Sequence, residues 1–389
     1  MNCINDFNCL IDFIKENPND FDIKLKKQFA ISTKICPYNK DWYMFKYDQF
    51  ESDFCNPIVR AARGSVLEIK SNIRPICLPF YKFNNLGQEG CDEVDWNTAE
   101  VSLKIDGSLI KISKIDNEIF LFTNGSWADQ EVEPTGLAGE ETETDNCKTY
   151  ADFINYCLTD KPLWFDNIPN NTTMMFELVG PKTRVLVKYP KTKMYFLGAR
   201  DNLTMKEYKR VDFKNKYEIP FDVPPTFDFD NEKDLLKELE KWEGDKEGVV
   251  ICDSNFRRIK IKTDAYKKLK FIRGEGNFSE KAILQSVIEG SEDDAMAAFP
   301  ELYTKIIEIK NKVRNYLEVR KSILAVGNKE YEDKLLKFKD AKIAKKEYFL
   351  WTKSYEEEIQ HLLLKCLNKD EEFVKKEIFK KLTIEKLRS

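Results

Sequence analysis

The sequence predicts an α+β fold in which a domain of antiparallel sheets is followed by an all-α domain. Short runs of β-branched and aromatic residues, separated by turn residues, extend from Phe29 to about Lys270. Beyond residue 271 these runs give way to apolar residues at helical spacing. A chain of 389 residues has room for two or three domains. We therefore expect domains at 1–270 and 271–389.

Nine runs in the first part of the chain have the residue types of β-strands. They are WYMFKYD (42–48), ARGSVLEIK (62–70), AEVSLKIDGSLIKISKI (99–115), NEIFLFTNGS (117–126), TTMMFELVG (172–180), TRVLVKY (183–189), KMYFLGAR (193–200), EGVVICD (247–253) and FRRIKIK (256–262). Two helical patterns interrupt them, near 149–158 and 231–242. Mixed strands of this kind are typical of α+β domains with antiparallel sheets.

Helical patterning occurs at both ends of the chain. Near the N-terminus one apolar face spans residues 4–16, and Asn17-Pro18 ends the run. In the last third two apolar faces repeat every three or four residues. They consist of Leu302, Ile306, Ile309, Val313 and Tyr316, and of Ile359, Leu362, Leu363, Cys366 and Leu367. These patterns predict a separate helical domain.

The composition argues against several classes of function. There are 63 Lys and Arg against 67 Asp and Glu, a net charge of −4, so the chain is not a globally basic nucleic-acid binder. A local basic groove is still allowed. The chain has one histidine, His361, which disfavours Ser–His, Cys–His and multi-histidine metal mechanisms. Its ten cysteines form no C-x-x-C pair and read as reduced thiols of a cytosolic-type compartment.

Neither a membrane span nor secretion is indicated. No run of 18 apolar residues occurs in the sequence. The first residues, MNCINDFNCLIDFIKEN, carry acids where a signal peptide would carry basic residues.

The motif Lys104-Ile105-Asp106-Gly107 is the first candidate for chemistry. Alone it is weak, because an ordinary strand ending in an Asp-Gly turn has the same sequence. Further charged residues accompany it in order along the chain. They are Arg63-Gly64, Glu177, Arg200, Glu247-Gly248 and Lys260-Ile261-Lys262. The joint occurrence is far more specific than any one part.

One strand in this set is expected to have a cationic face. Side chains alternate along a strand, so Arg258, Lys260 and Lys262 point to one side and Ile259 and Ile261 to the other. The functional interpretation is a phosphate-binding face. The structural alternative is a solvated edge strand, on which three like charges would repel one another unless a phosphate neutralised them.

A lysine can act as a nucleophile only when it is unprotonated, and its ordinary pKa is about 10.4. Nearby cations and desolvation lower that value. Lys260, Lys262 and Arg63 would be such cations for Lys104 and would also stabilise the charge of a triphosphate. This chemistry needs no histidine.

The ordered set resembles the covalent lysyl nucleotidyltransferases, the superfamily of ATP-dependent ligases and mRNA capping enzymes. Further strings resemble the phage-type RNA ligase 1 family over about residues 60–320, and the two ends of the chain do so only by layout. The strings are ARGSVLE, FYKFNNLG, KIDGSLI, FELVGPKTRVLVKY, FLGARDN, EGVVI, IKIKTDAYKKL and LQSVIEGSEDDAMAAF. The resemblance implies a nucleotidyltransferase domain (an ATP-grasp-like ligase domain) followed by the family's own helical domain.

The resemblance also implies an activity. ATP would be the co-substrate, with Mg²⁺ or Mn²⁺, and lysyl–AMP and RNA–adenylate would be intermediates in joining a 5′-phosphate to a 3′-hydroxyl RNA end. The implied substrate is RNA, above all broken tRNA, with an end-healing kinase–phosphatase as a possible partner. We expect a monomer in the cytoplasm of the cell or of a virus-infected host.

Residue roles carry over from the family position by position. Lys104 would be the nucleophile, and the other positions would surround it as nucleotide, phosphate or metal contacts. Asp106 and Gly107 would shape the nucleotide pocket, Arg63 and Lys82 would contact nucleotide or phosphate, Glu177 would bond the ribose, Glu247 would lie near the lysine and the metal, and Lys260 and Lys262 would bind phosphates. Tyr266, Asp293 and Asp294 match further positions, and Glu247 and Asp293 are the metal candidates. Tyr195 or Phe196 could stack on adenine, although core packing is the commoner role of such residues.

Two positions depart from the family. Asn124 stands where a basic residue is frequent, and Asn84 stands where an aromatic residue is frequent. Both bear on contacts to phosphates and RNA ends rather than on nucleotidyl transfer.

A lysine-rich stretch in the helical domain has two interpretations. It comprises Lys334, Lys337, Lys339, Lys342, Lys345 and Lys346. It could follow the phosphates of a structured RNA such as tRNA, or it could be a solvated helix face balanced by nearby glutamates.

Two other functions stay open. A DNA ligase or a GTP-using capping enzyme shares the chemistry, but no OB-fold pattern follows the Lys-x-Lys strand. A non-catalytic RNA-binding relative is the second, and loss of some of the charged set would be expected of it.

Overall fold

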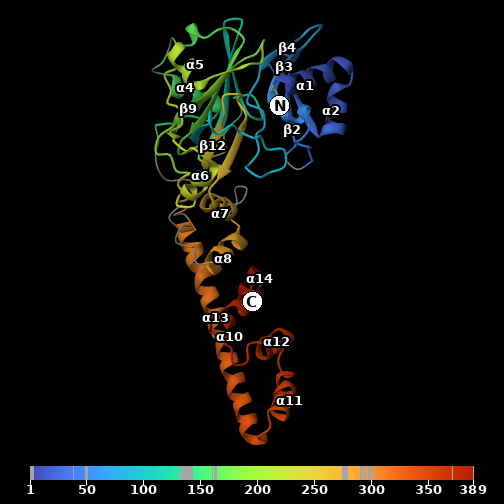
Figure 1. Ribbon diagram of the computed structural model, residues 1–389, viewed down its shortest axis with the longest axis vertical. Helices are drawn as coiled ribbons and strands as arrows, with labels where there is room; N and C mark the ends of the chain where they lie inside the picture. The colour runs from blue at the N-terminus through green and yellow to red at the C-terminus, as the bar shows by residue number, and fades with distance from the viewer. Residues whose placement is uncertain are drawn as a thin grey trace. The chain divides into compact units, whose positions relative to one another are not determined.

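The computed structural model describes residues 4–37, 39–48, 51–129, 131–132, 143–159, 161, 164–273, 279–289, 292, 295–296, 299, 302–369 and 371–388. The chain divides into two compact units, 1–267 and 268–389 (Figure 1). Within the described residues the first unit contains three antiparallel sheets and the second contains helices. The predicted α+β fold class is therefore confirmed.

The first sheet joins the N-terminal helices to the rest of the unit. Its order is β1-β2-β3-β4, with β1 (Ile31–Ile35), β2 (Trp42–Tyr47), β3 (Arg63–Ile69) and β4 (Ile73–Cys77). The associated helices are α1 (Ile4–Glu16), α2 (Phe21–Phe29) and α3 (Pro57–Ala61). The predicted helix over 4–16 is confirmed, because its apolar residues Phe7, Leu10, Ile11 and Ile14 are buried together with Phe45 and Leu67 of the sheet.

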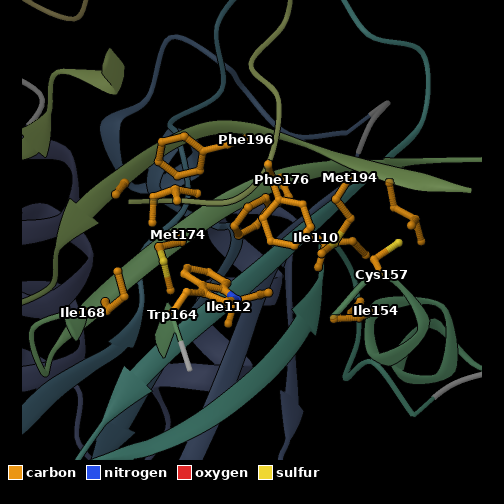
Figure 2. Packing of buried hydrophobic residues seen from close by; sticks show 14 of the residues in the cluster. Ile110, Ile112, Ile154, Cys157, Trp164, Ile168, Met174, Phe176, Met194 and Phe196 are labelled. Atoms are coloured by element: carbon orange, nitrogen blue, oxygen red, sulfur yellow. The ribbon is translucent and has the colours of Figure 1, made fainter. Parts of the chain in front are cut away.

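The second sheet holds the largest core of the unit. Its order is β10-β9-β8-β6-β7, with β6 (Ser108–Ile115), β7 (Glu118–Thr123), β8 (Thr172–Val179), β9 (Lys193–Asp201) and β10 (Glu207–Tyr208). One face packs against α4 (Tyr150–Leu158), the 3₁₀ turn Trp164–Asn167 and α5 (Arg210–Lys216). Figure 2 shows Phe176 and Phe196 at the centre of this cluster, with Trp164 and Met174 beside them.

The third sheet is formed by strands far apart in the sequence. Its order is β11-β5-β12-β13, with β5 (Glu100–Leu103), β11 (Thr226–Phe227), β12 (Gly248–Cys252) and β13 (Arg258–Lys262). Val101, Val249, Ile251 and Ile259 turn one face toward α6 (Glu232–Leu239). The other face is therefore free to carry polar side chains.

One predicted strand is wrong. The run TRVLVKY, 183–189, is a loop rather than a strand. The backbone N–H groups of Leu186 and Val187 donate to the carboxylate of Asp106 instead of to a neighbouring strand. A tertiary hydrogen bond has therefore overridden the β-propensity of the run.

The second unit is built on one long helix. Its elements are α8 (Glu280–Glu289), α10 (Tyr303–Phe338), α11 (Ala341–Thr352), α12 (Glu357–Lys365), α13 (Glu371–Phe379) and α14 (Ile384–Arg388), while α7 (Asp264–Arg273) precedes them. α10 buries the predicted face that contains Ile306, Ile309 and Val313. Lys339, the residue after α10, has a left-handed backbone conformation that ends the helix. The side chain of Asp340 then caps the start of α11, so the two helices form a hairpin. Of the helices in the described ranges, none combines the length and apolar composition needed to cross a membrane.

Replacing Phe176 tests the second-sheet core. Phe176→Ala removes a fully buried ring that contacts Trp164, Phe196 and Phe221. We expect the free energy of unfolding to fall by about 3–5 kcal/mol. Tryptophan fluorescence during urea unfolding measures it, since five of the six tryptophans lie in the first unit. Leu203→Ala removes an exposed side chain and should change the stability by no more than about 0.5 kcal/mol; equal losses in the two variants would contradict this packing.

Candidate active site

A cleft of about 750 Å³ is lined mostly by residues of the second and third sheets, and β3 of the first sheet contributes Arg63. Strands β5, β12 and β13 contribute one part of the lining and β8, β9 and β10 another. Six of the predicted site residues line it: Arg63, Lys104, Gly107, Glu177, Lys260 and Lys262. Three others are buried beside the lining, Asp106, Glu247 and Tyr266, and the partly exposed Lys82 lies near Arg63 and Lys260. The structure therefore gathers these ten residues around one cleft of the first unit.

Lys104 and Lys262 share one carboxylate. Lys104 follows β5, and its Nζ lies 2.6 Å from Oε2 of Glu247. The Nζ of Lys262 lies 2.8 Å from Oε1 of the same residue. Glu247 is buried, whereas both lysines are partly exposed to the cleft. The carboxylate thus holds the two ammonium groups side by side.

The charge state of Glu247 follows from this arrangement. Burial alone would raise the pKa of its carboxyl group. The charges of Lys104 and Lys262 outweigh burial, and the pKa lies below its ordinary value. Glu247 is therefore ionised at neutral pH.

The backbone fixes the same three residues. The N–H of Lys104 donates to the carbonyl of Gly248 at 2.8 Å. Gly248 has φ +146°, and a Cβ there would collide with the carbonyl oxygen of Ile261 on β13. Glycine is therefore needed where β12 begins, and it keeps Glu247 beside Lys104 and Lys262.

Asp106 anchors the turn after Lys104. Its carboxylate accepts hydrogen bonds from the Tyr266 hydroxyl at 2.8 Å and from the N–H groups of Leu186 and Val187 at 2.8 and 2.7 Å. Burial, followed by the charge of Glu247, raises its pKa. These hydrogen bonds hold Asp106 and Tyr266 against the loop that contains Leu186, and their predicted contact with the nucleotide stays a prediction.

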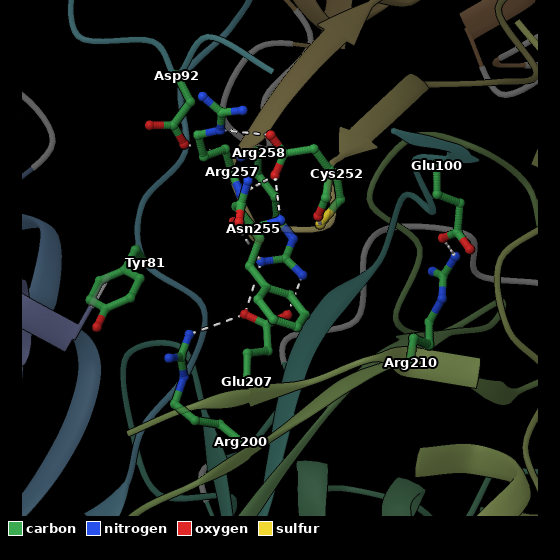
Figure 3. A network of polar contacts seen from close by, with 12 residues as sticks. Tyr81, Asp92, Glu100, Arg200, Glu207, Arg210, Cys252, Asn255, Arg257 and Arg258 are labelled. Carbon is green, nitrogen blue, oxygen red and sulfur yellow. Dashed lines mark hydrogen bonds and ion pairs between the residues drawn. The ribbon is translucent and has the colours of Figure 1, made fainter. Parts of the chain in front are cut away.

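The cationic face of β13 is partly neutralised by protein carboxylates. Arg258, Lys260 and Lys262 all line the cleft, in agreement with their alternation along the strand. Arg258 pairs with Glu207, which also pairs with the buried Arg200, as Figure 3 shows. Lys262 pairs with Glu247. A phosphate is therefore not required to neutralise the whole face.

Lys260 differs from its two neighbours. Within the described residues no ion pair engages it, and its Nζ lies over the ring of Phe83 at 5.3 Å from the centroid. Burial, and then nearby cations of which Arg63 is the strongest, lower the pKa of Lys260 to about 7. It is the β13 cation best placed to receive an anion.

Arg63, Glu177 and Lys82 lie at the same end of the cleft. Arg63 donates to the carbonyl of Tyr81 at 3.1 Å. Burial raises the pKa of Glu177 to about 7, although the charge of Lys104 acts in the opposite direction. Burial and Arg63 lower the pKa of Lys82 to about 8, and its ammonium lies over the ring of Phe54. The cations here are crowded, which favours an anionic ligand.

Two apolar residues that were not among the predicted site residues also line the cleft. Leu197 of β9 and Val250 of β12 come from the two different sheets. Phe196, a candidate for stacking on adenine, belongs to the core instead. Alternation along β9 could have revealed this, because a buried Phe196 turns Leu197 to the opposite face.

The predicted metal candidates are only partly described. Asp293 and Asp294 lie outside the described residues. Both oxygens of Glu247 are held by lysines. In the ranges that the structure describes, no group of three or more His, Cys, Asp or Glu residues could hold a metal ion. A divalent cation fits here only if nucleotide phosphates and water supply most of its ligands, as Mg²⁺ prefers.

Sequence comparison identifies the family. A family model described as RNA ligase matches residues 61–266, which is just over half of the 389-residue chain. The chain belongs to the RNA ligase family. This RNA ligase family member is also 26% identical over 307 residues to a protein of Autographa californica nuclear polyhedrosis virus that carries the name bifunctional polynucleotide kinase/RNA ligase. The match covers 74% of this chain and 41% of the viral protein, so the chain spans about two fifths of that relative's length.

Two solved RNA ligases are similar to this family member at low identity. An archaeal ATP-dependent RNA ligase aligns with 81% of this chain and 82% of its own, at 14% identity and a TM-score of 0.46. A mutant of the Naegleria gruberi RNA ligase, solved with ATP and Mn, aligns with 43% of this chain and 50% of its own, at 17% identity and a TM-score of 0.33.

The lowered pKa of Lys260 predicts a pH-dependent stability. The folded chain loses this proton near pH 7 and the unfolded chain near 10.5. Between these pH values the unfolded chain binds more protons, so the free energy of unfolding rises with pH. Lys260→Met should therefore be more stable than the wild type at pH 7, with a difference that shrinks toward pH 10. Urea unfolding at several pH values measures it.

A control and a ligand complete this test. Lys241→Met replaces an exposed lysine and reports the effect of the exchange itself. Inorganic pyrophosphate should stabilise the wild type more than Lys260→Met. A difference that does not change with pH would contradict the assigned pKa.

Proposed function

We propose that this chain is an ATP-dependent RNA ligase that joins 5′-phosphate and 3′-hydroxyl ends through lysyl–AMP and RNA–adenylate. The observation that carries the proposal is the position of Lys104. Its amine lies on Glu247 in a cleft where Arg63 and Lys260 are crowded cations without ion pairs in the described part of the chain. Membership of the RNA ligase family supports the same reaction.

In the first step Lys104 would attack the α-phosphorus of ATP. The new bond joins Nζ to phosphorus, the bond from that phosphorus to the bridging oxygen breaks, and pyrophosphate leaves. The attacking form of a lysine is the unprotonated amine, so the proton that Nζ of Lys104 donates to Glu247 has to leave the nitrogen before the attack. Phosphates that bind Lys260 and Lys262 bring the substrate to the amine and stabilise the charge that develops on the leaving group.

The two sheets would hold the rest of the nucleotide. Leu197 and Val250 offer apolar surfaces to the two faces of the base. Glu177, with its raised pKa, could donate or accept a hydrogen bond with the ribose. Glu100 and Arg210, which also line the cleft, form an ion pair with each other (Figure 3). Magnesium or manganese would reach this site with the phosphates and reduce their charge.

Two further steps would complete the reaction. An oxygen of the RNA 5′-phosphate attacks the phosphorus of lysyl–AMP, which frees Lys104 and forms an RNA–adenylate. The 3′-hydroxyl of the other end then attacks the 5′-phosphorus, loses its proton and releases AMP. We assign these steps to the first domain, 1–270, because every lining residue of the cleft comes from it. One chain thus supplies the site, which supports action as a monomer.

We assign RNA recognition to the second domain, 271–389. Of the lysine-rich stretch, Lys334 pairs with Glu330. The remaining five lysines are exposed, and the described residues provide them with no ion pair: Lys337, Lys339, Lys342, Lys345 and Lys346. This favours the phosphate-binding interpretation over a balanced helix face, and a structured RNA such as a broken tRNA is the substrate that would use it.

Two inferences concern the cellular setting. The viral relative is named as a kinase as well as a ligase, which supports the kinase part of the predicted kinase–phosphatase as the source of 5′-phosphate ends. Each cysteine in the described ranges is unpaired, which supports the cytoplasm as the compartment.

Lys104→Ala tests the nucleophile. The wild type incubated with α-labelled ATP and a divalent ion should retain label after denaturing electrophoresis, and the variant should retain none. Removing one partner of a buried ion pair can cost about 3–5 kcal/mol, but Glu247 keeps Lys262, so the variant should still fold. Circular dichroism and urea unfolding check the fold. Label in the variant would reject Lys104 as the nucleophile.

A substrate panel tests the reaction class. We expect the wild type to seal 5′-phosphorylated single-stranded RNA and anticodon-broken tRNA with ATP, and to leave nicked duplex DNA unsealed. Product lengths on denaturing gels measure each reaction. Efficient sealing of nicked DNA would identify a DNA ligase, a labelled adduct from GTP alone would identify a capping-type enzyme, and tRNA binding without ATP turnover would identify a non-catalytic relative.

A further inference from the structure

The cations that line the cleft differ in how their charges are balanced. Two arginines of the lining pair with carboxylates: Arg210 with Glu100, and Arg258 with Glu207. Arg63 and Lys260, which also line the cleft, have no ion pair within the described residues. A polyanion longer than ATP would therefore leave the cleft at the Arg63 end.

A turn after β7 forms the rim at that end. Thr123, Asn124 and Gly125 all line the cleft. We call residues 123–126 the β7 turn. Asn124 brings no charge to this rim.

Two lysines of the first sheet meet the β7 turn from outside the cleft. The Nζ of Lys34, on β1, donates to the carbonyl of Gly125 at 3.0 Å. The side chain of Lys46, on β2, lies against Gly125, where a Cβ would be 2.8 Å from its Nζ. Both residues are exposed, and the described part of the chain provides no ion pair for either.

Strand pairing connects these lysines to the active site. Lys46 pairs across the β2–β3 register with Arg63, which lines the cleft. Arg63 is in turn the strongest of the cations that act on Lys260. A continuous row of cations thus leads from β13, through Arg63, to Lys46 and Lys34.

We propose that the β7 turn, Lys46 and Lys34 bind backbone phosphates of the RNA strand whose 5′-phosphate accepts AMP. This inference rests on the proposed ligase function. Lys34 and Lys46 lie outside the cleft lining, so a triphosphate held at Lys260 does not need them, whereas a strand continuing from the accepted phosphate passes over them. Two lysines from a different sheet supply the charge that Asn124 lacks.

The test starts from the enzyme already carrying AMP. Transfer of AMP to a 5′-phosphorylated single-stranded RNA is followed in a single turnover, at RNA concentrations below saturation and at several salt concentrations. The variants are Lys46→Ala, Lys46→Arg, Lys46→Glu and the double variant Lys34→Ala/Lys46→Ala. Lys40→Ala is the matched control, because Lys40 is an exposed lysine in the turn between the same two strands.

The expected effect is a loss of RNA affinity that depends on salt. Each phosphate contact on a single strand contributes about 0.7 to the slope of log affinity against log salt, so the double variant should lose about 1.4. Transfer should be at least tenfold slower at low salt in the double variant and in Lys46→Glu, and near the wild-type rate in Lys46→Arg and Lys40→Ala. Formation of lysyl–AMP from ATP should change less than twofold in all of them.

Two outcomes would overturn the inference. Unchanged transfer and salt slope in the double variant would remove both lysines from the RNA path. An equal loss in lysyl–AMP formation would place them at the triphosphate instead. Fluorescence anisotropy with the same RNA measures the salt slope without catalysis, so a wild type that forms no adduct would reject the proposed function while the binding data still decide on Lys34 and Lys46.

Discussion

The structure of the cleft depends on one buried carboxylate that bridges two lysines. Glu247 has no access to solvent that could replace its partners, and an unpaired buried charge costs several kcal/mol. Lys104 and Lys262 supply the two charges that compensate it in this structure. The same contact keeps two like charges from separating the strands that carry them.

The conformation of the surrounding backbone brings the carboxylate of Glu247 and the two lysines together. Gly248 lets β12 approach β13 more closely than any residue with a Cβ would allow, and its carbonyl accepts the N–H of Lys104. Asp106 draws the turn after Lys104 toward Tyr266 and toward the loop containing Leu186. Segments separated by up to 160 residues are thereby fixed around one amine. The short motif around Lys104 works only because these distant segments complete it.

The sequence alone predicted the elements whose residues interact locally. The helix over 4–16 and the alternation along β13 follow from spacing, and the structure agrees with both. It failed where a distant partner decides the outcome. The loop 183–189 has strand propensity but its N–H groups serve Asp106. Likewise, nothing in the spacing of Arg258 reveals that Glu207 neutralises it, or that the Tyr266 hydroxyl donates to Asp106.

The pairing of charges within the cleft, rather than the net charge of the chain, determines where the cleft attracts a phosphate. A net charge of −4 would not attract a polyanion to the chain as a whole. The arginines near Glu100 each form an ion pair with a carboxylate, so they attract a phosphate only weakly.

Burial and repulsion from nearby cations, of which Arg63 is the strongest, lower the pKa of Lys260 to about 7. Lys260 is therefore partly uncharged until an anion arrives. An incoming phosphate would raise that pKa and draw a proton onto Lys260, so the site strengthens its own attraction as the anion binds. In the proposed complex with ATP, the base would contact Leu197 and Val250 and the phosphates would lie near Lys104.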